Sequence, residues 1–162
     1  MVNPELATHL IAPFALMAVP AVVYGTWLWF SRRPGLGIVE TPKLTNPLSL
    51  KTAVKFALLY ALIGFLVKAA TQFDLMQHGL LPLSFVSGLT DMDAISLSMA
   101  GNFTSGDVPL VLAARAIIVA AIANSLLKAA FSASLGSPAL RRQTTLVLGA
   151  TVVAGFAALW LV

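Results

Sequence analysis

The segment Leu6–Ser31, LATHLIAPFALMAVPAVVYGTWLWFS, decides the fold class because it contains no Asp, Glu, Lys or Arg. A membrane-spanning α-helix needs about 20 consecutive, mostly apolar residues. The segment Gln143–Val162 is equally free of charge. These two segments are therefore the clearest predicted transmembrane helices.

The composition of the whole chain supports the same class. Of 162 residues, 59% are hydrophobic and only 10% are charged, and the mean hydropathy is +0.91. So few charges cannot cover the surface of a water-soluble domain of this size. We expect an all-α integral membrane protein with four to five transmembrane helices, forming one transmembrane domain over residues 1–162, with the lipid bilayer as its main solvent.

Several function classes are disfavoured by the residues. The net charge is +4, but the basic residues flank apolar segments and form no patch with interleaved aromatic side chains, so nucleic acid is not an expected partner. The chain has no cysteine, which excludes disulfides and thiolate chemistry. Without a histidine cluster, a nucleophile elbow or a phosphate loop, we expect no enzyme and no organic cofactor.

Three further segments complete the predicted order. A second apolar segment covers Lys51–Thr71 and contains Lys55 and Lys68, whose long side chains can reach the membrane interfaces. The third covers Gly79–Ala100, and the fourth runs from Val108 to Ser132. In the fifth, alanine recurs every four residues and predicts a close-packing stripe, made of Ala150, Ala154 and Ala158.

The third segment is irregular. Its first part is apolar to Val86, the residues Ser87–Asp93 interrupt it, and Ala94–Ala100 resumes it. This pattern predicts two half-helices with a break near Gly88.

Two parts of the chain align with each other, which predicts an internal repeat of two helices. Shifting the sequence sets Lys55 against Arg115 and Lys68 against Lys128, among alanines that also match. Slightly further on, Gly88 falls against Gly149. The repeat units would be about 48–105 and 108–162. Such duplications are common in transporters, although alanine-rich helices also align by chance.

The topology of the third segment is open between two arrangements. Arg32 and Arg33 follow the first helix, which predicts a retained helix with a cytoplasmic loop after it and the N-terminus outside. A hairpin that enters and leaves on one side would also make Arg141 and Arg142 cytoplasmic. A full crossing would put that pair outside, yet the two halves are together long enough to span, and we favour the full crossing.

The interruption holds the residues that best fit a site. In its plain interpretation, Thr90 and Asp93 form a capping box at a helix start. A charge at membrane depth costs at least about 2.5 kcal/mol, so we expect Asp91 and Asp93 to bind a metal cation or a proton. The Ser87 and Thr90 oxygens would complete a set of ligands suited to hard cations.

Two residues of the fourth segment are expected beside this site. Asn124 and Lys128 are four residues apart, so they share one face of a helix. Lys128 would neutralise a carboxylate or pair with an anionic substrate, or else reach the interface. Asn124 would line the path, or else form an interhelical hydrogen bond.

A family resemblance rests on this part of the chain. The residues that carry the likeness are Ser87-Gly88-Leu89-Thr90-Asp91-Met92-Asp93-Ala94-Ile95-Ser96-Leu97-Ser98, Ala114-Arg115-Ala116-Ile117, Ala123-Asn124-Ser125-Leu126-Leu127-Lys128 and Asn46-Pro47-Leu48. With them, the sequence resembles an uncharacterised bacterial integral membrane domain, domain of unknown function family 4010. The likeness covers about Asn46 to the C-terminus. That family is often joined to an MgtC/SapB-type domain, which this chain lacks. The resemblance implies a multi-pass protein of the bacterial inner membrane.

Two functions are compatible with these residues. The first is a small inner-membrane transporter or channel component, assembled as a homo-oligomer or with a partner membrane subunit, with a cation or proton site at the broken third helix. The second is a non-transporting accessory or assembly subunit, whose polar residues only pack helices and cap a half-helix.

Overall fold

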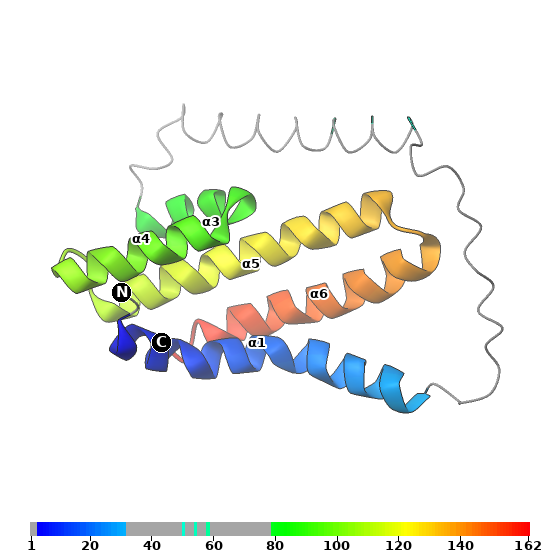
Figure 1. The fold of residues 1–162 in the computed structure, drawn as a ribbon, viewed down its shortest axis with the longest axis horizontal. Coiled ribbons are helices and arrows are strands. Elements are labelled where there is room, and N and C mark those ends of the chain that lie inside the picture. The colour runs from blue at the N-terminus through cyan, green and yellow to red at the C-terminus, as the bar shows by residue number, and fades with distance from the viewer. Residues whose placement is uncertain (1–2, 32–49, 51–53, 55–57, 59–78) are drawn as a thin grey trace.

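The computed structural model describes residues 3–31, 50, 54, 58 and 79–162. The described ranges contain no strand, which confirms the all-α prediction. The helices, labelled in Figure 1, are α1 (Pro4–Ser31), α3 (Leu80–Thr90), α4 (Met92–Ser105), α5 (Leu110–Leu135) and α6 (Pro138–Ala158).

Helix α5 is the centre of the fold, and each of the four other labelled helices packs against it. Its N-terminal half is buried on all sides, from Ala113 through Ala123 with few exceptions. Most of these residues are alanine, whose small side chain lets a neighbouring backbone approach closely. A helix that is apolar all round belongs in a protein core or a bilayer.

Helices α1 and α6 cover one side of α5. A turn at Gly136-Ser137 sends α6 back along α5, and the Ser137 Oγ accepts a hydrogen bond from the Leu140 N–H at 3.4 Å. The buried face of α6 consists of Val152, Gly155 and Ala158. The predicted stripe is therefore wrong at Ala150, which is exposed.

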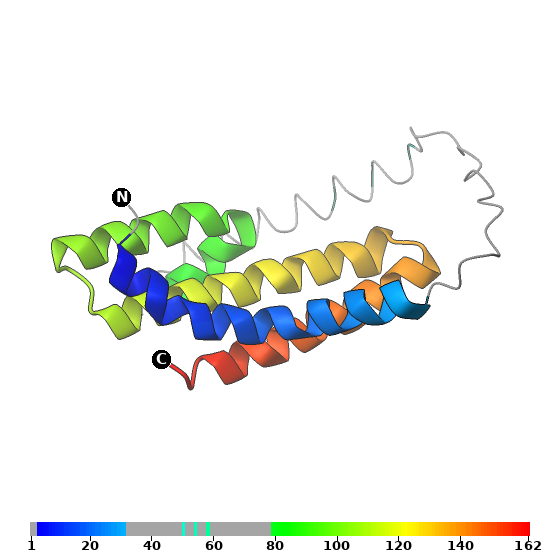
Figure 2. The same ribbon diagram turned by 60° about the horizontal axis from the view of Figure 1, so that its bottom comes forward.

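Helices α3 and α4 form a hairpin on another side of α5 (Figures 1 and 2). Leu80, at the start of α3, packs against the buried cluster around Ala113, and Gly88, near its end, meets Ala120. Helix α4 then returns, because Phe103 at its end packs against the same cluster as Leu80. The favoured full crossing is therefore wrong, since both ends of this segment lie beside the start of α5.

The break between the two helices falls at Asp91. Its backbone is extended, with φ −150° and ψ 107°, and this residue reverses the chain direction. The predicted break near Gly88 is three residues too early, because Gly88 lies inside α3. The glycine serves a close approach instead. A Cβ there would lie 2.4 Å from the Ala120 carbonyl oxygen and 2.6 Å from its Cα.

By length and apolarity, α1 and α5 are the two helices in the described ranges that could cross a membrane. Helix α6 is not apolar enough over a sufficient length to be counted with them. It begins with the polar residues Arg141, Arg142 and Gln143 in its first two turns and ends at Ala158, before the apolar C-terminal residues. The predicted span Gln143–Val162 is thus only partly helical.

The second apolar segment, Lys55, Lys68 and most of the first repeat unit lie outside the described residues. In the second unit, Gly149 lies within the unbroken helix α6, where a Cβ would meet nothing within 4 Å. Its aligned partner Gly88 lies in the hairpin against Ala120. The internal repeat stays a prediction.

We expect Gly88→Ala to destabilise the protein by about 1–3 kcal/mol, because the added methyl group meets backbone that cannot move aside. Gly149→Ala is the matched control, and it should be neutral or stabilising by up to about 1 kcal/mol. Thermal unfolding of both variants in mild detergent measures the difference. Equal midpoints for the two variants would contradict the close approach of α3 to α5.

Candidate functional site

The Asp91 side chain caps α4. Its Oδ1 accepts hydrogen bonds from the Asp93 N–H at 2.9 Å and from the Ala94 N–H at 3.3 Å. Thr90, expected to be the capping residue, instead ends α3, where its Oγ1 donates to the Ser87 carbonyl oxygen at 2.9 Å. The capping box is therefore wrong, and the N-cap lies one residue later than predicted.

A cavity of about 340 Å³ lies between α3 and α4 at this break. Its lining residues are Leu83, Ser87, Thr90, Asp91, Ala94, Ile95 and Ser98. Both capping hydrogen bonds use Oδ1 of Asp91, which leaves Oδ2 of the same carboxylate outside them. The structure thus brings together three predicted site residues, Ser87, Thr90 and Asp91, around one cavity with oxygen-bearing side chains.

Asn124 supports the hairpin from α5. Its Nδ2 donates a hydrogen bond to the Gly88 carbonyl oxygen at 3.4 Å. In an unbroken helix this carbonyl would accept from the N–H four residues later, but the break at Asp91 ends the helix first. The interhelical hydrogen bond, one of the two alternatives for Asn124, is what the structure shows.

Lys128 lies one helical turn beyond Asn124 on α5, and it is exposed. The part of the chain that the structure describes shows no ion pair between Lys128 and either Asp91 or Asp93. Helix α3 runs in the same direction as α5 and ends beside Asn124, so its negative dipole end points toward the region of Lys128. The pairing of Lys128 with a carboxylate stays a prediction.

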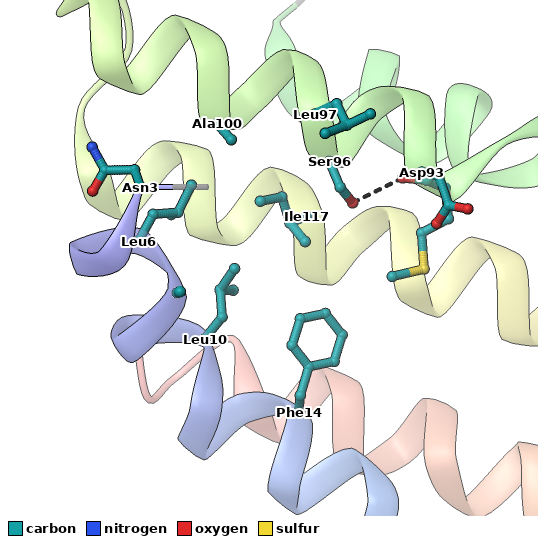
Figure 3. A pocket seen from close by; sticks show the side chains of 11 residues that line it. Asn3, Leu6, Leu10, Phe14, Asp93, Ser96, Leu97, Ala100 and Ile117 are labelled. Carbon is teal, nitrogen blue, oxygen red and sulfur yellow. Dashed lines mark hydrogen bonds between the residues drawn. The ribbon is translucent and has the colours of Figure 1, made fainter. Parts of the chain in front are cut away.

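Asp93 lines a different cavity. This cavity has a volume of about 330 Å³ and lies between α1 and α4 (Figure 3). Asp91 is absent from its lining, and Asp93 is absent from that of the first cavity. The structure therefore does not bring the two predicted metal ligands together. Within the described ranges, no group of three or more His, Asp or Glu residues could hold a metal ion.

Sequence reasoning did not select Ser98 or Asn3, although each lines one of the cavities. Ser98 could have been predicted from the sequence. It is four residues after Ala94, so both residues lie on the same face of α4 as the Asp91 cap. Asn3 carries no such signal, since its place near α4 depends on how α1 packs.

Comparison with known proteins agrees with the resemblance. The chain matches the family described as "Domain of unknown function (DUF4010)" over residues 1–136. It belongs to this family. The match includes α1 and ends at the α5–α6 turn, whereas the expected likeness ran from Asn46 to the C-terminus.

A relative of the chain is an uncharacterized protein of Aquifex aeolicus (strain VF5). It is 34% identical over 99 residues, which are 60% of this chain and 42% of that protein. The chain thus matches less than half the length of this relative. No solved structure matches the chain.

The two roles of the Asp91 side chain can be separated by substitution. Asn is as good an N-cap as Asp, whereas Ala cannot accept the two hydrogen bonds. We expect Asp91→Ala to lower the free energy of unfolding by about 1 kcal/mol and Asp91→Asn to leave it nearly unchanged. Circular dichroism during thermal unfolding measures both. If the two variants unfold alike, the capping assignment is wrong.

Proposed function

We propose that this chain is a subunit of a transporter or channel in the bacterial inner membrane, with a cation or proton site at the hairpin α3–α4. The observation that carries the proposal is a carboxylate at a helix break beside the middle of a long apolar helix. Helix α5 has 26 residues and Asn124, which contacts the hairpin, is well inside it.

The depth of the break supports a role beyond capping. At about 1.5 Å per residue, Ala120 and Asn124 lie roughly 15 and 21 Å along α5 from its start. If α5 spans a bilayer whose apolar core is about 30 Å thick, the hairpin tip is near the middle. A carboxylate there is costly unless it faces protein, water or a bound cation.

The chemistry of the first cavity favours a hard cation or a proton. The Asp91 carboxylate and the Ser87, Thr90 and Ser98 hydroxyls offer oxygen atoms, which suit hard cations better than zinc. Irregular backbone at membrane depth is tolerated where it lines a cavity. Transporters often place their ion sites at such discontinuous helices. The proposed site is therefore centred on Asp91 and does not require Asp93.

The charge distribution supports an orientation. Arg141 and Arg142 lie in the first two turns of α6, which starts at the end of the bundle where α1 ends (Figure 1). Glu5 and Asp107 belong to the opposite end, with the N-terminus. Lys and Arg accumulate on cytoplasmic ends, so the α5–α6 turn is proposed to be cytoplasmic. In a full crossing Arg141 and Arg142 would lie outside, against this rule, whereas the hairpin keeps both residues on the cytoplasmic side.

Assembly with other subunits is part of the proposal. Helix α1 packs along α6, and Met17 enters the core beside Gly155; these contacts favour a retained helix over a cleaved signal sequence. Much of its surface is nevertheless exposed and apolar, at Ile11, Val19, Val22, Val23, Trp27, Trp29 and Phe30. Lipid or a neighbouring subunit would cover these side chains. This exposed apolar surface favours a homo-oligomer or a partner membrane subunit.

A second candidate function is a non-transporting accessory or assembly subunit. Several hydroxyl groups are satisfied by their own helices: Ser84 donates to the Leu80 carbonyl, Ser96 to that of Met92, and Thr151 to that of Val147. Asp91 has a structural task as the cap of α4. In this alternative the polar residues stabilise the hairpin and move no ion.

The proposed topology can be tested because the chain has no cysteine of its own. We expect single cysteines at Gly79 and Asp107 to react with a membrane-impermeant maleimide added outside spheroplasts, because both residues flank the hairpin at one end of α5. A cysteine at Ala139, in the first turn of α6, should react only after the membrane is opened. Labelling of positions 79 and 107 from opposite sides would contradict the hairpin.

Ion movement can be tested in proteoliposomes that hold the full chain. Separate vesicle batches contain a pH-sensitive dye or a Mg²⁺-sensitive dye, and an outward-to-inward gradient of protons or Mg²⁺ is applied. We expect flux of at least one of these ions, and Asp91→Asn should reduce it at least tenfold, because Asn keeps the cap but removes the charge.

The control for this experiment is Asp107→Asn, which removes an exposed carboxylate from the α4–α5 loop and should leave the flux unchanged. Equal flux in the wild-type protein and Asp91→Asn would refute the site. A wild-type chain that moves neither ion, while Asp91→Ala impairs assembly, would favour the accessory subunit.

A further inference from the structure

The cavity between α1 and α4 has a chemistry that neither the capping nor the proposed ion site uses. Its volume is about 330 Å³, and α5 forms its floor through Ile117. The rest of the lining is mostly apolar: Leu6, Ala7, Leu10 and Phe14 of α1, with Met92, Leu97 and Ala100 of α4. Figure 3 shows α1 on one side and α4 on the other, with Asn3 and Asp93 at opposite ends.

Two of its three polar side chains are already satisfied. The Ser96 hydroxyl donates to the Met92 carbonyl oxygen at 2.8 Å, as the dashed line in Figure 3 shows. Asn3 accepts from the Glu5 N–H at 3.0 Å and donates to the Thr104 Oγ1 at 3.4 Å. Asp93 differs. Among the described residues, its carboxylate has neither a hydrogen bond nor an ion pair.

An apolar cavity with one unpaired carboxylate at its end selects a particular class of ligand. The Asp93 side chain is exposed at one end of the cavity, so a neutral hydrocarbon chain would fill the apolar part without using the charge. An anion would be repelled by Asp93. A molecule with one positive charge at the end of an apolar chain matches both features.

We propose that this cavity binds an amphipathic ammonium ion, with its nitrogen on the Asp93 carboxylate and its apolar chain along Leu10 and Leu6. Phe14 of α1 also lines the cavity and adds an aromatic surface to it (Figure 3). This site lies on the other side of α4 from the Asp91 cavity. It is therefore independent of the proposed function, and either one can fail without the other.

The test uses octyltrimethylammonium as the probe and the full chain in phosphatidylcholine nanodiscs, with empty nanodiscs as the reference for partitioning into lipid. Calorimetry is expected to show saturable binding to the protein. Asp93→Asn should weaken it at least tenfold, and Asp93→Glu, which keeps the charge, should restore most of it. Binding of neutral octanol should change less than twofold in Asp93→Asn.

Two further variants separate a built site from a general effect. Ala7→Phe places a large side chain in the cavity and should abolish binding of both probes. Glu5→Gln removes a nearby carboxylate that is outside the lining and should leave binding unchanged. Equal losses in Glu5→Gln and Asp93→Asn would overturn the proposal, because general surface charge would then explain binding.

The proposal is also overturned if octanol and octyltrimethylammonium bind equally well to the wild-type protein. In that case the occupant of the cavity is an uncharged lipid chain. Unfolding midpoints of the Asp93 variants in the same nanodiscs show whether each variant is folded, and Asp93→Glu keeps the test decisive if Asp93→Asn is not.

Discussion

The hydrogen bonding of the backbone at Asp91 is the constraint on which the hairpin depends. A helix break leaves backbone N–H and C=O groups without their partners in the helix. Here the chain satisfies them itself: the Asp91 carboxylate accepts from two N–H groups of α4, and Asn124 donates to the Gly88 carbonyl. The Asp91 N–H also bonds to the Ser87 carbonyl at 2.7 Å. Because these backbone groups are hydrogen-bonded, the chain can reverse direction beside a long apolar helix at little cost in free energy.

The reach of Asn124 depends in turn on the contact between Gly88 and Ala120. A side chain at position 88 would hold α3 away from α5, and the amide of Asn124 would then fall short of the carbonyl. Three residues that are common in helices thus act together. Gly88 removes bulk, Ala120 offers bare backbone, and Asn124 supplies the donor. Such small-residue contacts replace the hydrophobic effect as a source of helix association in lipid.

The sequence was sufficient for the helical class and the location of the interruption, because apolar length and charge are local properties. It was insufficient for the path of the third segment, since a crossing and a hairpin need the same apolar halves. The cap was predicted at Thr90 and lies at Asp91, because the choice depends on which residue takes extended dihedral angles. Asp91 and Asp93 were also predicted to share one site. In the structure they line different cavities, because residues i and i+2 do not share a helix face.

The division of the two carboxylates between the two sides of α4 gives them different chemistry. Both lie at the N-terminal end of α4, where the positive end of the helix dipole favours negative charge by about 0.3–1 kcal/mol each. Neither carboxylate forms an ion pair among the described residues, and reversible binding of a cation requires that freedom. Asp91 faces hydroxyl groups and suits a small, hard ion, whereas Asp93 faces hydrocarbon and suits a charge carried on an apolar body. One helix end would then serve two kinds of cation, separated by the width of α4.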